Sequence, residues 1–76
     1  MDWFAFLVRL RQTGMPLTQM QQFARLHAGG VATLEQRRQL LDEHRRHVEE
    51  AIAVQQDNLA ALANKIMYYD RLIKNG

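Results

Sequence analysis

Residues 33–75 decide the fold, and they read TLEQRRQLLDEHRRHVEEAIAVQQDNLAALANKIMYYDRLIKN. This stretch contains neither Gly nor Pro, and it is rich in Leu, Ala, Gln, Glu and Arg, which favour helices. We therefore predict one long dimerisation helix over residues 33–76. Between the cap Thr33 and the breaker Gly76, the helix would have about 41 residues and a length of roughly 60 Å, whereas a compact chain of this size spans only about 30 Å. Such a helix cannot be covered by its own chain.

Apolar residues recur along this helix in two alternating seven-residue series, as they do in a coiled coil. The residues expected at a dimer interface are Leu34, Leu41, Val48, Ile52, Leu59, Leu62, Ile66, Tyr69 and Ile73. We call these two series, together with the interrupting Arg38, Arg45 and Gln55, the seam. The pattern predicts an all-α fold in which two copies of the chain form an antiparallel coiled-coil homodimer.

Residues 1–28 are predicted to form a hairpin of two short helices. The first helix is expected to begin after Asp2 as N-cap and to end at Gly14, with Pro16 preventing its continuation. The patterns Thr18-x-x-Gln21 and Thr33-x-x-Gln36 predict capping boxes for the second helix and for the long helix. Residues 29–32 form a glycine-containing link between the hairpin and the long helix.

The first short helix is apolar around most of its circumference, so it needs cover on more than one side. Its expected partners are the second short helix and the long helices of a dimer, at least one of them contributed by the other subunit. Antiparallel pairing would let each hairpin dock on the first half of the partner's long helix, and the sequence leaves open whether it docks there or on its own helix. The residues expected in the hairpin core are Trp3, Phe4, Leu7, Leu10, Met20 and Phe23. The polar edge of the same helix consists of Arg9, Arg11 and Gln12.

Composition excludes several classes of protein. The 76 residues include no Cys, which removes disulfides and thiolate metal sites, and the longest apolar run near the N-terminus is too short for a signal or a membrane span. We therefore expect a cytoplasmic protein. No Ser, no Cys and no Gly-rich phosphate loop is present, so we predict no catalytic residues, no enzyme activity and no cofactor.

One group of metal-ligand types stands on the long helix: Glu43, His44, His47 and Glu50. We interpret these residues as a solvated charged face and predict no metal site, because they fall outside the seam. His27 is interpreted as a residue near a helix C-terminus, where the helix dipole favours its charge. Tyr68 and Tyr69 could line a pocket, but Tyr69 is on the seam and dimer packing is the preferred interpretation.

Two stretches resemble the MerR family of bacterial transcription regulators. Residues 2–20, DWFAFLVRLRQTGMPLTQM, resemble the third and fourth helices of that family, with its Gly-x-Pro-Leu turn. The long helix, from Thr33-Leu34-Glu35-Gln36-Arg37 to Lys65-Ile66-x-Tyr68-Tyr69, is similar to the family's dimerisation helix. Hairpin, glycine break and heptad helix occur in the same order, so the resemblance covers essentially the whole chain.

The resemblance implies that the hairpin is the second wing of a DNA-binding domain. It would place Arg11, and with it Arg9 and Gln12, near DNA phosphates, although a solvated helix edge explains the same residues. The family's recognition helix-turn-helix has no counterpart in these residues, so we expect specific DNA binding only through a longer parent protein. The alternatives are a free-standing helical homodimeric adaptor and a small-molecule-binding module, neither of which involves a membrane.

Overall fold

The structure is a computed structural model that describes residues 2–76, and these residues fold into helices. Helix α1 spans Trp3–Gln12, α2 spans Leu17–Ala28, the 3-10 helix η1 spans Gly30–Thr33, and α3 spans Leu34–Asn75. Since none of the described residues lies in a strand, the predicted all-α class is confirmed.

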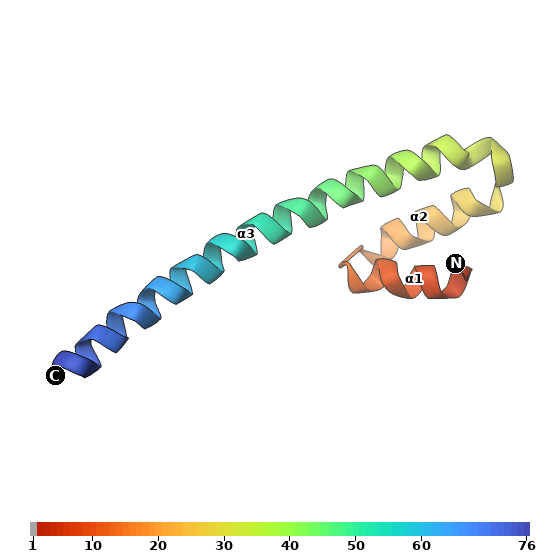
Figure 1. Cartoon of the computed structure of the whole chain (residues 1–76). Coiled ribbons are helices and arrows are strands. Elements are labelled where there is room, and N and C mark those ends of the chain that lie inside the picture. Colours follow the sequence, from red (N-terminus) through yellow and green to blue (C-terminus); the bar gives the residue numbers. More distant parts are fainter. Residues whose placement is uncertain (1) are drawn as a thin grey trace.

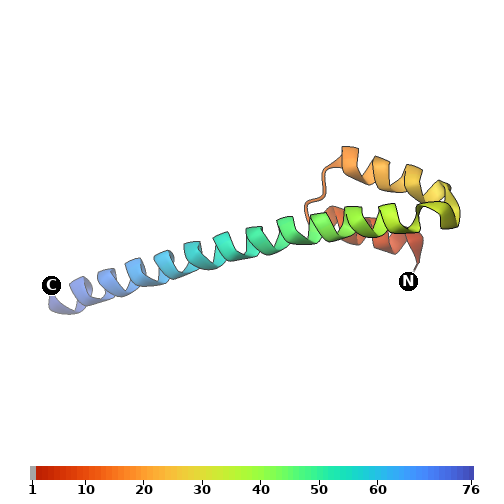
Figure 2. The same cartoon turned by 90° about the horizontal axis from the view of Figure 1, so that it is seen from above.

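α3 dominates the shape of the molecule. It has 42 residues, and the chain measures 67 × 21 × 20 Å. Figure 1 shows α1 and α2 as a hairpin beside the first half of α3, while the second half extends away from everything else. The view from above in Figure 2 shows the same free second half. The prediction of a helix too long to be covered by its own chain is therefore confirmed.

The ends of α1 follow the predicted signals. The carboxylate of Asp2 accepts a hydrogen bond from the backbone N–H of Phe4 at 3.4 Å, as an N-cap does. After the helix, Gly14 has φ of 87°, a left-handed conformation that costs a glycine little. The chain then reverses over Met15 and enters α2 after Pro16.

Both predicted capping boxes are wrong. Pro16 is the N-cap of α2, so Thr18 already lies inside the first turn, and no side chain caps this helix. Thr33 does precede α3, but its hydroxyl donates backward to the carbonyl oxygens of Leu26 and Gly30. The reason is the 3-10 turn over Gly30–Thr33, which follows α2 almost directly and leaves those carbonyls in need of donors.

The core lies where α1 and α2 meet the first half of α3. Its buried apolar residues are Leu10, Met15 and Phe23, and the partly buried residues that pack around them are Trp3, Phe6, Leu7, Met20, Leu40 and Leu41. Within the single chain, the hairpin thus docks on the first half of its own α3. Phe4 was also expected in this core, but its side chain is 71% exposed. It lies about 100° around α1 from Trp3 and points away from α2 and α3.

Candidate dimerisation face and nucleic-acid contacts

The second half of α3 leaves its whole circumference open to solvent. Each residue from 51 to 76 is exposed. Among them are large apolar side chains at seam positions, namely Ile52, Leu59, Leu62, Ile66, Tyr69 and Ile73. An apolar stripe of this length on a single helix has no stabilising contacts in the isolated chain, and such stripes mark interaction surfaces.

The first half of α3 has two distinct faces. One face carries Leu40 and His44 and packs against the hairpin. The other carries Arg38 and Arg45, whose side chains are exposed and make ion pairs along the helix. Of the predicted seam residues, Leu41 and Val48 are half-buried between these faces, and Leu34 is exposed.

Ion pairs on α3 stay on the surface. Arg38 Nη2 lies 2.7 Å from Glu35 Oε1, and Arg45 Nη2 lies 2.7 Å from Asp42 Oδ1. The hydrogen bonds from Arg38 lower the pKa of the Glu35 carboxyl below its ordinary value, and the same contact raises the pKa of Arg38. Because both side chains are about two-thirds exposed, water screens this pair and its effect on stability is small.

His44 lies in a different setting from the solvated face that its sequence position suggested. Its side chain is buried, and its Nε2 lies 2.7 Å from the hydroxyl oxygen of Thr13, just before the α1–α2 turn. The Thr13 hydroxyl donates its single proton to the carbonyl of Leu10 at 2.6 Å, so the imidazole must donate to Thr13. The hydrogen bond of His44 therefore links the turn of the hairpin to α3.

The other end of the hairpin is closed by an aromatic stack. The Trp3 ring stacks with Phe23, at a centroid distance of 5.5 Å, and with His27, at 3.9 Å, and the planes are inclined by 15° and 24°. His27 thus covers the indole of Trp3, a role that its position near a helix C-terminus did not reveal. The signal that could have shown it is the aromatic residue at the start of α1, since an antiparallel hairpin brings that residue beside the end of α2.

The polar edge of α1 is open to solvent. Arg9, Arg11 and Gln12 are exposed, and neither arginine takes part in an ion pair within the described residues. The exposed apolar side chains of Phe4 and Val8 lie on the same helix. Unpaired arginines on an exposed helix edge can reach phosphate oxygens, which they bind with charge-assisted hydrogen bonds.

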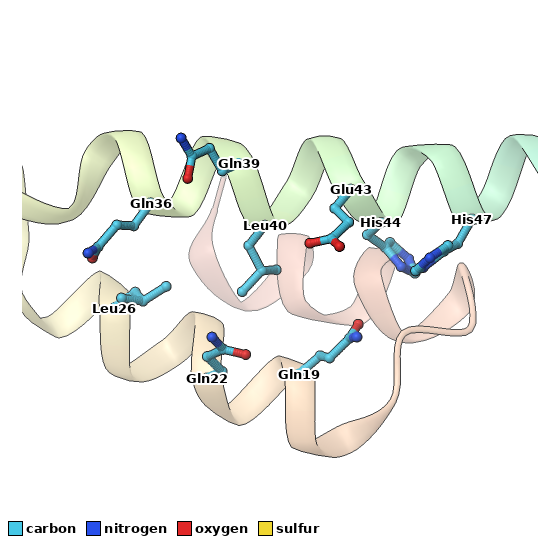
Figure 3. A pocket seen from close by; sticks show the side chains of 9 residues that line it. All are labelled: Gln19, Gln22, Leu26, Gln36, Gln39, Leu40, Glu43, His44 and His47. Atoms are coloured by element: carbon cyan, nitrogen blue, oxygen red, sulfur yellow. The ribbon is translucent and has the colours of Figure 1, made fainter.

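A polar cleft separates α2 from α3, with a volume of about 400 Å³. Figure 3 shows the side chains that line it: Gln19, Gln22 and Leu26 from α2, and Gln36, Gln39, Leu40, Glu43, His44 and His47 from α3. Most of these groups are amides, imidazoles or a carboxylate, whereas sites for small organic molecules are mostly apolar. The cleft therefore gives little support to a small-molecule-binding module.

His44 and His47 both line the cleft. Even so, residues 2–76 bring together no three His, Asp or Glu side chains that could hold a metal ion. Near the C-terminus, Tyr68 and Tyr69 meet edge to face at 5.5 Å, and the ammonium of Lys65 lies 5.3 Å from the ring of Tyr68. These aromatic rings line no described pocket and stand on the free end of α3.

No helix among residues 2–76 is long and apolar enough to cross a membrane. Comparison with known proteins gives one match, in which residues 1–65 fit the family described as MerR, DNA binding. No curated protein matches the chain. No solved structure matches it either. The family match covers most of the 76 residues and includes the hairpin, the link and most of α3. The chain therefore belongs to the MerR family of DNA-binding transcription regulators.

Proposed function

We propose that this chain is the dimerisation and wing region of a MerR-family regulator. In this proposal, residues 33–76 pair with a second copy as an antiparallel coiled coil, residues 1–28 form a wing, and residues 29–32 join the two. The observation that carries the proposal is the exposure of all the apolar seam residues from Ile52 to Ile73, on the half of α3 that has no partner within its chain.

The energetics favour a second copy as that partner. Among residues 2–76, only three apolar side chains are buried, namely Leu10, Met15 and Phe23, which is a small core for a chain of this length. Each large apolar side chain of the seam would contribute about 1.5–3 kcal/mol on complete burial. The seam repeats every seven residues, so it is complementary to another helix with the same repeat.

The proposed role of the hairpin is to position the protein on DNA. Arg9, Arg11 and Gln12 would contact phosphate oxygens from the exposed edge of α1. Such contacts set orientation but carry no sequence information, which comes from a recognition helix in the major groove. Because residues 2–76 contain no such element beyond the hairpin and α3, we expect the isolated chain to bind DNA weakly and without sequence preference.

Sedimentation equilibrium tests the dimer. We expect a dimer at micromolar concentration and a monomer for Leu59→Asp, since a carboxylate in the seam would be buried without a partner. Val54→Asp is the matched control, because Val54 is 59% exposed, close to the 66% of Leu59, but lies off the seam. A folded monomer of the unaltered chain would overturn the proposal and would leave the seam to a different partner, as in the adaptor hypothesis.

Salt-dependent DNA binding tests the wing. We expect binding at low ionic strength that is equal for any two duplex sequences and falls steeply with added salt. Arg11→Ala should make the slope of the logarithm of affinity against the logarithm of salt concentration shallower by about one. Arg71→Ala, at the far end of α3, is the control and should leave the slope unchanged. An equal effect of both variants would show that α1 has no special role.

A further inference from the structure

Three polar residues interrupt the seam, and they restrict how two copies can pair. In an antiparallel coiled coil the numbers of two facing residues add up to a constant, and moving the helices by one heptad changes this sum by about 7. The apolar residues of the seam alone are compatible with several such sums, and each sum corresponds to one register of the two helices. The polar residues Arg38, Arg45 and Gln55 distinguish between them, because a polar residue in a seam fixes register when it meets a polar residue of the partner.

We infer that the two α3 helices pair with Arg45 facing the partner's Gln55, so that facing residues add up to about 100. This inference rests on the proposed dimer and assigns its register. The guanidinium of Arg45 can donate to the amide oxygen of the partner's Gln55 while it keeps its ion pair with Asp42. Val48 then faces the partner's Ile52, Leu41 faces the partner's Leu59, and Leu34 faces the partner's Ile66.

The other registers are less favourable. A sum of about 93 pairs Arg38 with the partner's Gln55, but it sets Arg45 against the partner's Val48 and carries Ile66, Tyr69 and Ile73 beyond the partner's α3 and η1. A sum of about 107 sets Arg45 opposite the partner's Leu62, which accepts no hydrogen bond, and a sum of about 114 sets it opposite the partner's Tyr69 and leaves Leu34 without a facing residue. A sum of about 121 places Arg45 at the end of the partner's helix, away from its apolar side chains. In that register only the residues from Val48 onward face seam residues of the partner, and Leu34 stays exposed. A parallel dimer places Arg45 against the partner's Arg45, and like charges that face each other repel.

Arg38 meets the partner's Leu62 in the inferred register. A guanidinium need not be buried there, because the carbon stem of Arg38 can cover Leu62 while its charged group stays at the edge with Glu35. The hairpin does not obstruct this contact. Arg37 and His44 face the hairpin side, and Arg38 and Arg45 each lie one residue further along, about 100° around the helix. A partner helix therefore has room beside the hairpin.

The ends of the chain support the same register. Val31, in η1, and Ile73, near the end of α3, are 82% and 77% exposed, the highest values among the large apolar side chains of residues 2–76. With a sum of about 100, the last two turns of α3 pass the start of the partner's α3 and reach its η1. Tyr69 then lies level with the partner's Val31. Each copy's C-terminal turns thus cover the exposed corner of the other copy.

Disulfide cross-linking tests the register. The chain contains no Cys, so only the introduced cysteines can form disulfides. The informative double variant is Leu34→Cys with Ile66→Cys, since both positions are exposed in the single chain and far apart on one helix. Leu34→Cys with Ile73→Cys reports a sum of 107, and Ile52→Cys with Tyr69→Cys reports 121. In a register whose sum differs by 7, two residues that faced each other lie about 10 Å apart along the helix axis, which is too far for a disulfide.

We expect oxidised dimers of the first double variant in at least tenfold excess over those of the other two. Preferential cross-linking of either other pair overturns the register, and so does efficient cross-linking of Ile66→Cys alone, which reports a parallel dimer. Sedimentation of the reduced variants separates this result from the proposed function. A dimer with the wrong cross-links refutes only the register, whereas a reduced monomer refutes the dimer itself.

The exposed corner provides a second measurement. Val31→Asp should weaken dimerisation about tenfold or more, because a charge would replace an apolar contact with the partner's Tyr69. Val54→Asp is again the control, since that side chain is also exposed but does not face the partner in any of these registers. Equal dimer dissociation constants for the two variants would contradict the placement of η1 at the interface.

Discussion

Replacing His44 by Ala should loosen the hairpin from α3. The imidazole is buried, and its Nε2–H donates to the Thr13 hydroxyl across 2.7 Å, at the point where the chain leaves α1 for the turn. This hydrogen bond joins residues 31 positions apart in the sequence. Its loss should therefore change the attachment of the hairpin and leave the helices themselves intact.

The magnitude follows from two contributions. A hydrogen bond of this kind contributes about 0.5–1.5 kcal/mol net. Removing the buried ring also leaves a cavity beside α1, which adds about 1–2 kcal/mol. We expect His44→Ala to lower the free energy of unfolding by about 2–3 kcal/mol. Thr13→Val keeps the shape but leaves the His44 N–H without an acceptor, and should cost about 1–3 kcal/mol.

A double-mutant cycle in urea at fixed protein concentration measures the interaction. Concentration must be constant because dimerisation adds to apparent stability. We expect a coupling energy of about 1 kcal/mol between the two positions. His47→Ala, at an exposed neighbouring position, should change stability by no more than about 0.5 kcal/mol. The reasoning fails if His44→Ala costs no more than His47→Ala, or if the two substitutions are simply additive.

Three further predictions concern the turn, the aromatic stack and the surface ion pair. Gly14→Ala should cost about 1–2 kcal/mol in urea denaturation through its φ of 87° alone, since no neighbouring atom would clash with the added methyl group. His27→Ala should shift the emission of the only tryptophan, Trp3, to longer wavelength by uncovering its ring, and unchanged emission would contradict the stack. The lowered pKa of Glu35 means that its bond to Arg38 stabilises the fold at neutral pH and is lost as pH falls through the folded-state value. In an NMR titration, Arg38→Ala should raise the Glu35 midpoint.

Local signals made most of the helices predictable. The breakers at Gly14, Pro16 and Gly29 fall between the observed helices, and the stretch without Gly or Pro became the single long helix. These features depend on backbone preferences of single residues, which a sequence displays directly. The capping boxes failed for a related reason. Their pattern is short, and Thr18 fits it although the helix had already begun after Pro16.

Tertiary contacts were harder to foresee. Met15 is completely buried although it lies in a link between helices, because the turn folds its side chain back under α1 and α2. Arg37, which donates to the carbonyl of Gly30 at 2.8 Å, and His44 look in the sequence like two members of a charged surface. Their positions on the hairpin side of α3 depend on how the hairpin packs, and no pattern within α3 contains that information.

The position of the hairpin accounts for the polar residues in the first half of the seam. There the helix must serve two partners, since the hairpin covers the face of His44 and a second copy is proposed to cover the face of Arg45. Exposed arginines at these seam positions reduce apolar burial, and a polar residue at such a position typically gives up stability for register. If the hairpins are the proposed wings, the register sets the distance between them. A slip of one heptad in the sum would move the two hairpins by about 10 Å along the coiled coil, close to a third of the roughly 34 Å repeat of B-DNA. We therefore interpret Arg45 and Gln55 as the residues that set the spacing between the two basic edges.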